Sequence, residues 1–175
     1  RVSLPQVPEA LYARQIGEEG SNVIAYLKDD NNNGFTLVLT ANGGIDAPSE
    51  SNVLFGAKDA TNAWNANVKS VDLTNFRTDN ATTLAFLFNG SKSLETITGI
   101  EHLNTTQVQD LTAAFQYCAA LTNLDLSSWK TDNVTSVSNM FFQTTQLQTV
   151  TGMDTWNMPK LTEARALFAY SGITK

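Results

Sequence analysis

The chain repeats one pattern of residues along most of its length of 175 residues. The repeat units begin at residues 68, 94, 121 and 147 with the phrases VKSVDL, LETITG, LTNLDL and LQTVTG, and a partial fifth unit begins at residue 173. The period is therefore 26 or 27 residues. A fixed period of this length is typical of arrays in which each unit buries its apolar residues against its neighbours. The sequence therefore predicts a stack of units over residues 68–175.

Each unit combines two hydrophobic periods. Its opening phrase reads as a strand, with apolar residues at the first and fourth places, and its second half has apolar residues at helical spacing. The helical positions are Ala81, Leu84, Leu87 and Phe88, then Val108, Leu111, Ala114 and Phe115, then Val134, Val137, Met140 and Phe141, and finally Leu161, Ala164, Leu167 and Phe168. The predicted fold class is α/β: a leucine-rich-repeat solenoid with a parallel strand ladder and one helix per repeat.

The units alternate between two types. The first and third contain LxxLDL and then an aromatic residue, Phe76 or Trp129, whereas the second and fourth contain TG and one additional residue. Glycine permits backbone conformations that other residues avoid, so we expect Gly99 and Gly152 to lie in a bulge. Ordinary leucine-rich repeats have Asn or Cys near the position of the aromatic residue, so the turn here must differ.

Residues 1–67 do not follow the period, and we expect them to form an N-terminal cap on the array. Two strand-like segments, 22–28 and 35–40, surround the phrase DDNNNG, which predicts a β-hairpin. Asp29, Asn31, Asn33 and Gly34 also match the first half of a calcium loop, but its twelfth position is Thr40 rather than Glu. A polar hairpin turn is the favoured reading, and cation binding at the turn stays open.

At the other end, the chain stops three residues into a repeat unit. We expect further repeats or another module to follow in the parent protein. An uncapped end leaves strand edges and apolar side chains without a partner, so self-association through this end is a second expectation.

Composition excludes several functions. The net charge is −6 and the sequence pI is about 4.6, which disfavours nucleic acid and anionic membranes as partners. No apolar stretch is long enough to insert into a bilayer. Cys118 is the single cysteine, so the chain cannot form an internal disulfide framework or a zinc site with several thiolates. We expect no cofactor and no metal site.

The sequence also indicates that the chain is not an enzyme. His102 is the single histidine and has no catalytic motif around it, and Cys118 lies in a small-residue turn where we expect it to be buried. Asp72 and Asp125 hold the same repeat position two units apart, so their backbones are expected about 10 Å apart. That separation is too wide for a retaining glycosidase and marginal for an inverting one. We predict no catalytic residues.

The third unit carries a family resemblance. Its sequence LTNLDLSSWKTDNVTSVSNMF, preceded by YCAA, resembles the BspA-like leucine-rich repeats of bacterial surface proteins, and the likeness covers residues 68–175. Proteins of that family are typically secreted or anchored in the cell wall and are linked to adhesion. The resemblance thus implies an extracellular location and a host or matrix protein, or a glycan, as partner.

Solenoids commonly bind through the outward residues of their strands. By register, the candidate binding residues are Lys69, Ser70, Asp72, Glu95, Thr96, Thr98, Thr122, Asn123, Asp125, Gln148, Thr149 and Thr151. This set is polar and mildly acidic and lacks the Tyr, Trp and Arg cluster of a tight protein interface. Two hypotheses follow: a non-enzymatic recognition module that binds weakly at many points, or a structural spacer that projects another domain and binds nothing itself.

Overall fold

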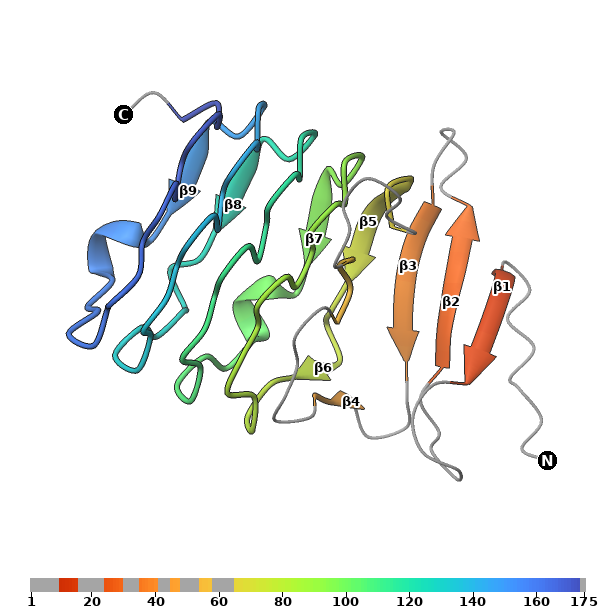
Figure 1. Ribbon diagram of the computed structural model, residues 1–175. Coiled ribbons are helices and arrows are strands. Elements are labelled where there is room, and N and C mark those ends of the chain that lie inside the picture. Colours follow the sequence, from red (N-terminus) through yellow and green to blue (C-terminus); the bar gives the residue numbers. More distant parts are fainter. Residues whose placement is uncertain are drawn as a thin grey trace.

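The computed structural model describes residues 10–15, 24–29, 35–40, 45–47, 54–57 and 65–173. Within this part of the chain the strands lie side by side, and each repeat unit forms one coil of a stack (Figure 1). We number the coils 1 to 4 and assign to them residues 68–93, 94–120, 121–146 and 147–172. The strands of the coils form the strand face, and we call the surface formed by the second halves of the coils the turn face.

Three N-terminal strands extend the sheet of the coils. β1 (Ala10–Gln15) pairs antiparallel with β2 (Ile24–Asp29), which pairs antiparallel with β3 (Phe35–Thr40). The β2 and β3 strands overlap the two segments expected around DDNNNG, whereas β1 was not predicted. β3 then pairs in parallel with the first strand of coil 1, with Leu37 opposite Val71. The N-terminal strands and coil 1 therefore share one sheet.

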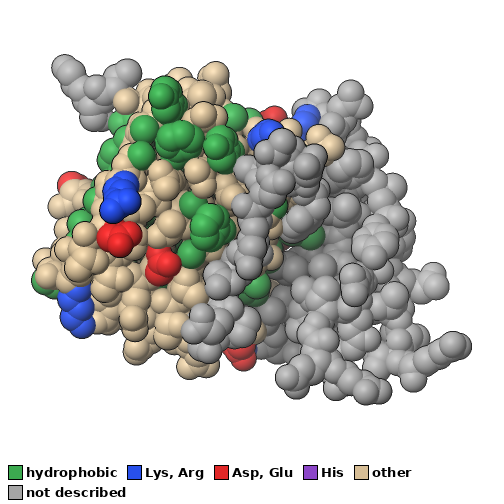
Figure 2. All heavy atoms as spheres, viewed as in Figure 1, with side chains coloured by type: hydrophobic (Ala, Val, Ile, Leu, Met, Phe, Trp, Pro, Cys, Tyr) green, Lys and Arg blue, Asp and Glu red, His purple; other side chains and the backbone are tan. Residues whose placement is uncertain are grey.

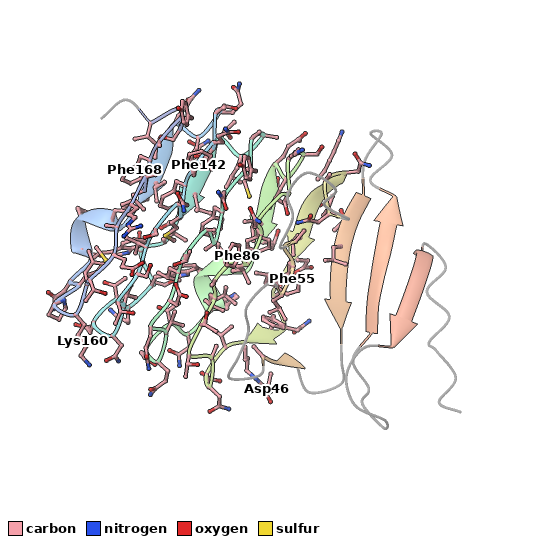
Figure 3. All side chains as sticks on the ribbon, viewed as in Figure 1. Asp46, Phe55, Phe86, Phe142, Lys160 and Phe168 are labelled. Atoms are coloured by element: carbon pink, nitrogen blue, oxygen red, sulfur yellow. The ribbon has the colours of Figure 1, made fainter. Side chains whose placement is uncertain are left out.

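A second contact joins the N-terminal part to coil 1. β4 (Ile45–Asp46) pairs in parallel with β6 (Phe76–Arg77). The Nε of Arg77 donates a hydrogen bond to Oδ1 of Asp46 at 2.8 Å, and Figure 3 shows Asp46 at the lower edge of the stack. Both side chains are largely exposed, so this ion pair adds little to stability.

The strands of the coils are hydrogen-bonded in two pairs. β5 (Val68–Asp72) pairs in parallel with β7 (Thr96–Thr98), and β8 (Asn123–Asp125) pairs in parallel with β9 (Thr149–Thr151). Residues 26 positions apart face each other in both pairs. β7 and β8, in contrast, are not hydrogen-bonded as strands. The strand ladder is therefore interrupted between coils 2 and 3, and each hydrogen-bonded pair of strands joins one repeat of each alternating type.

The second half of each coil is built from turns, and the α-helix predicted there does not form anywhere in residues 65–173. Two residues in every coil, four positions apart, have a left-handed φ that an α-helix excludes. These residues are Phe86 and Gly90, Ala113 and Tyr117, Asn139 and Gln143, and Ala166 and Tyr170, with φ between +49° and +81°.

Hydrogen bonds between the coils explain this backbone. In coil 2, alternate N–H groups donate to carbonyl oxygens of coil 3 at 2.8 to 3.0 Å: Leu111 to Ser136, Ala113 to Ser138, Phe115 to Met140 and Tyr117 to Phe142. The intervening N–H groups of Ala114 and Gln116 close local turns, three residues back. The same pattern joins coil 1 to coil 2 and coil 3 to coil 4. An α-helix would use these groups within one coil, whereas here they bond to the next coil. The N–H groups just before them, such as those of Gln109 and Thr162, donate in the opposite direction, to Thr82 and Thr135 of the preceding coil.

Apolar residues of the turns fill the core. Leu84, Leu87 and Phe88 are fully buried, as are their counterparts in coils 2 and 3. One phenylalanine from each coil stacks on the next, and Phe55 extends the row ahead of coil 1. The row is Phe55, Phe88, Phe115, Phe141 and Phe168, with ring centroids 5.4 to 5.7 Å apart. Figure 3 labels the two ends of this row, Phe55 and Phe168. Each such contact adds about 0.5–1.5 kcal/mol beyond the burial of apolar area.

Gly99 and Gly152 have a different role from the predicted one. Each has a left-handed φ, +81° or +93°, and begins a short 3₁₀-helix, Ile100–His102 or Met153–Thr155, rather than a bulge. A Cβ on Gly152 would lie 2.3 Å from the Cα of Ser127 in the preceding coil. The TG units therefore need glycine because their backbone touches the backbone of the neighbouring LDL unit.

Buried threonines hold the loops between the strand and the turns. The hydroxyl groups of Thr78, Thr105 and Thr131 donate to the carbonyl oxygens of Asn104, Lys130 and Asn157 in the next coil at 2.8 to 3.1 Å. All three threonines are almost completely buried. These side chains satisfy loop backbone groups, the task expected of Asn or Cys in ordinary leucine-rich repeats.

Candidate functional site

The strand face carries the twelve residues predicted to bind. Nine of them are exposed, whereas Lys69, Ser70 and Asp72 are half-buried. Pairing of the strands places Ser70 beside Thr96, Asp72 beside Thr98, Asn123 beside Thr149 and Asp125 beside Thr151. Ser70 also shares a hydrogen bond with Thr36 of β3, so the polar row continues onto the N-terminal strands. The predicted residues are thus brought together within each pair of coils.

The carboxylates of Asp72 and Asp125 on this face are hydrogen-bonded within the turns that follow them. Oδ1 of Asp72 accepts hydrogen bonds from the backbone N–H and the hydroxyl of Thr74, and Oδ1 of Asp125 does the same with Ser127. The hydrogen bonds from the hydroxyl and then the backbone N–H of Ser127 lower the pKa of Asp125. The two carboxylates therefore close the turns after β5 and β8. The sequence prediction treated them as free binding groups and did not foresee these hydrogen bonds.

Most exposed side chains of the strand face carry hydroxyl or amide groups. Its exposed members are Thr, Asn and Gln apart from the carboxylates of Glu95 and Asp125, and no aromatic residue or arginine is among the twelve. Such a surface exchanges hydrogen bonds with a partner but buries little apolar area. Any one contact is therefore weak, and strength has to come from repetition along the stack.

A groove on the turn face was not predicted. It has a volume of about 580 Å³ and crosses all four coils. Its lining residues are Thr82, Thr83, Gln109, Asp110, Thr112, Thr135, Ser136, Thr162 and Glu163. The same positions form isolated parallel bridges from Thr83 through Asp110 and Ser136 to Glu163. In sequence, two polar residues precede the apolar residue Leu84 and each of its counterparts, and this repeated pair is the signal that could have located the groove.

The groove residues are largely committed to the stack. Thr83 Oγ1 and Asp110 Oδ1 accept backbone N–H groups two residues later, at 3.1 and 2.8 Å. The hydroxyls of Thr135 and Thr162 donate to carbonyl oxygens of the preceding coil at 3.0 Å. The groove is therefore a secondary candidate, because its side chains already serve contacts between coils.

Aromatic residues gather at one edge of the stack rather than on the strand face. Phe142 packs edge-on against Tyr117 and Tyr170 at centroid distances of 5.7 and 5.5 Å. Tyr170 is 73% exposed and Phe168 is 37% exposed. Figure 3 labels Phe142 and Phe168 close together at the upper end of coils 3 and 4, where Figure 2 shows hydrophobic side chains gathered.

Cys118 and His102, the two residues considered for catalysis from the sequence, lie in different surroundings. Cys118 is fully buried, as predicted, and burial raises the pKa of its thiol well above the usual range. Exposed His102 lies 3.5 Å from Oε1 of the neighbouring Glu101. The described residues hold no group of three or more His, Cys, Asp or Glu side chains suited to a metal ion. The DDNNNG turn, with its hypothetical cation, lies outside the described residues.

In the described part of the chain, no helix has the length and apolarity needed to cross a membrane.

Comparison with known proteins places the chain in a family. Searches of the curated proteins and of the solved structures find no significant match. Residues 57–174, more than half of the chain, match a family described as "Mycoplasma protein of unknown function, DUF285". The chain therefore belongs to this family of mycoplasma proteins.

Proposed function

We propose that the chain is a BspA-like leucine-rich-repeat module of a secreted or wall-anchored bacterial surface protein, and that it binds a host or matrix protein, or a glycan, without catalysis. Membership of a mycoplasma family supports a bacterial setting. The repeat phrase of coil 3 supports the BspA-like assignment. The parallel strands and their period support the solenoid as its fold class.

One observation carries the recognition function. The strand face presents exposed polar side chains in register along parallel strands, and most of them have no task in holding the coils together. Thr96 and Thr149, for example, lie exposed beside residues of the neighbouring coil. A rigid row of equivalent side chains suits a partner that also offers repeated polar groups, because each added contact raises the effective concentration of the next.

The test is surface-immobilised binding to a panel of purified matrix proteins and mucin glycans. The variant carries Thr96→Arg and Thr149→Arg, which place two bulky charged side chains on the exposed strand face. Asp72 and Asp125 stay unchanged, because their loss would disturb turns as well as binding. The matched control carries Asn80→Arg and Gln107→Arg, two exposed positions in the loops of coils 1 and 2. Recognition predicts binding by wild type and control and its loss, about tenfold or more, in the strand-face variant.

The spacer remains the second candidate, because the strand face lacks aromatic and arginine side chains. A continuous hydrogen-bond ladder between coils makes the array stiff, which suits a module that holds another domain away from the cell wall. Absence of binding by the wild type to every member of the panel at high micromolar concentration would favour this spacer over recognition.

A further inference from the structure

The groove on the turn face has a regular wall. Isolated bridges place Thr83, Asp110, Ser136 and Glu163 in one row, with one residue from each coil. Neighbouring coils are about 4.8 Å apart, so the row extends for about 14 Å. The groove volume of about 580 Å³ lies within the usual range of small-molecule sites. The groove can therefore hold a short linear molecule that lies across the coils.

Several lining side chains are held in place by the stack. Thr83 Oγ1 and Oδ1 of Asp110 accept backbone N–H groups, and the hydroxyls of Thr135 and Thr162 donate to the preceding coil. Such side chains have little rotamer freedom left to lose when a ligand binds. Their oxygen atoms keep lone pairs that these hydrogen bonds do not use. The groove is therefore preorganised and rich in hydrogen-bond acceptors.

Three lining groups are not committed to the stack. The amide of Gln109, Oδ2 of Asp110 and the carboxylate of Glu163 have no hydrogen-bond partner in the part of the chain that the structure describes. Gln109 and Glu163 are also exposed. An amide group both donates and accepts hydrogen bonds, whereas a carboxylate only accepts them. These groups of coils 2 and 4 are therefore available to a ligand.

The lining chemistry selects the class of ligand. An apolar ligand finds no aliphatic or aromatic side chain among the nine lining residues. An anion would be repelled by the carboxylates of Asp110 and Glu163. The two carboxylates lie two coils apart, about 10 Å along the row, so they cannot coordinate one metal ion together.

Addition of a peptide strand is disfavoured because the backbone at the groove is already paired. The N–H groups of Thr135 and Ser136 both donate to the carbonyl oxygen of Gln109. The N–H groups of Thr162 and Glu163 donate in the same way to the carbonyl oxygen of Thr135. Strand addition depends on free main-chain groups along an edge. A ligand of the groove therefore has to bind through side chains.

A chain of neutral sugar rings fits this lining. Its hydroxyl groups donate to the acceptors, and each carboxylate forms strong, charge-assisted hydrogen bonds with such donors. The row of lining residues follows the stacked coils, so an extended chain fits it better than a bent one. We propose that the turn-face groove binds a short, extended, neutral oligosaccharide, with Gln109, Asp110 and Glu163 as its main hydrogen-bonding groups. This site is separate from the strand face, and the proposal does not depend on what the strand face binds.

The test is an NMR titration of the full chain with cellotriose, an extended and uncharged glucose trisaccharide. The methyl signals of Thr112, Thr135 and Thr162 report on the groove, and those of Thr96 and Thr149 report on the strand face. Maltotriose, whose linkages bend the chain, is titrated in parallel. Spermidine, a linear polyamine, tests whether the carboxylates select a cation instead.

Two double variants accompany the wild type. The groove variant carries Gln109→Ala and Glu163→Ala, because neither side chain holds the coils together in the described structure. The matched control carries Gln107→Ala and Glu101→Ala, which remove the same two side-chain types from exposed positions of coil 2 outside both surfaces. Melting temperatures close to that of the wild type show that both variants fold.

The proposal predicts that cellotriose shifts the groove signals of the wild type and the control, and that its Kd is about tenfold or more higher in the groove variant. The affinity should change little between about 0.05 and about 0.5 M NaCl, because the ligand is uncharged. The strand-face signals should stay in place, and maltotriose should bind more weakly.

Three results would overturn the proposal. The first is a titration in which cellotriose leaves the groove signals unchanged or shifts only those of the strand face. The second is equal affinity of the groove for maltotriose, which would contradict an extended ligand. The third is tighter binding of spermidine that is lost at high salt, which would assign the groove to a cation.

Discussion

Phe141 and Phe168 stack almost parallel across coils 3 and 4, with ring centroids 5.4 Å apart and an interplanar angle of 2°. Phe141 is fully buried, but Phe168 has a neighbour on only one side in the described part of the chain. A phenylalanine in the interior of the row therefore contributes more to stability than the phenylalanine at its end. This difference leads to the first prediction.

Replacement of an inner member of the phenylalanine row should cost more than replacement of the last one. Phe115 is fully buried and lies between Phe88 and Phe141, so Phe115→Ala should lower the free energy of unfolding by about 3–5 kcal/mol. Phe168→Ala should cost about 1–2 kcal/mol, because part of its ring is already in water. Urea unfolding measures both. Equal costs would contradict the stacked arrangement.

At the turn residues with a left-handed φ, glycine and alanine should rank in the opposite order of stability from the one expected in a helix. Gln143 has a φ of +56°, where glycine is favoured over alanine by about 1 kcal/mol. In an α-helix the preference would be reversed by about the same amount. We expect Gln143→Gly to be more stable than Gln143→Ala, as measured by thermal and urea unfolding of the two variants. The reverse order would support the helix that the spacing of apolar residues suggested.

Gly152 should not tolerate a side chain. A Cβ at this position would meet backbone atoms of Leu126 and Ser127 at 2.3 to 2.9 Å, and the φ of +93° is unfavourable for alanine. Gly152→Ala should lower the free energy of unfolding by about 2–4 kcal/mol. Thr151→Ala, at an exposed neighbouring position, serves as the control and should change it by less than about 0.5 kcal/mol. A tolerated Gly152→Ala would show that the coils are less closely packed there.

Asp125 should make stability depend on pH in the acid range. Its pKa is lowered in the folded protein, so its contribution to stability is fully present above the unfolded value, about 3.9. This contribution is lost as the pH falls through the lower, folded pKa. The melting temperature of the wild type should therefore fall on acidification below about pH 4, and Asp125→Asn should show a smaller fall. An identical pH profile in the two proteins would mean that the Ser127 hydrogen bonds do not stabilise the carboxylate.

The sequence allowed the inward residues to be predicted but not the backbone that carries them. Leu84, Leu87 and Phe88 are buried as their spacing indicated. That spacing fits a helix, but it equally fits successive turns that close every three residues. The choice between them depends on hydrogen bonds to residues about 26 positions away, such as Leu84 to Asp110, which local periodicity does not report.

The candidate site was predictable to a similar degree. The apolar residues at the first and fourth places of each strand phrase marked its inward side, so the polar residues between them, such as Thr96 and Thr149, were expected to point outward. The turns in which the Asp72 and Asp125 carboxylates accept hydrogen bonds were not foreseen. The prediction followed apolar residues, and the polar residues of the phrases DLT and DLS lie outside that pattern. The groove was also missed, because the predicted helix was argued from the apolar residues alone and the polar pair before each Leu84 counterpart was not considered.

Threonine-methyl NMR tests the recognition function most directly, because both candidate surfaces are rich in threonine. The protein is titrated with the member of the matrix panel that it binds. Recognition through the strand face predicts that the methyl signals of Thr96, Thr98, Thr122, Thr149 and Thr151 shift or broaden, while those of Thr82, Thr112, Thr135 and Thr162 in the groove stay in place. Shifts confined to the groove threonines would contradict the strand face as the binding surface.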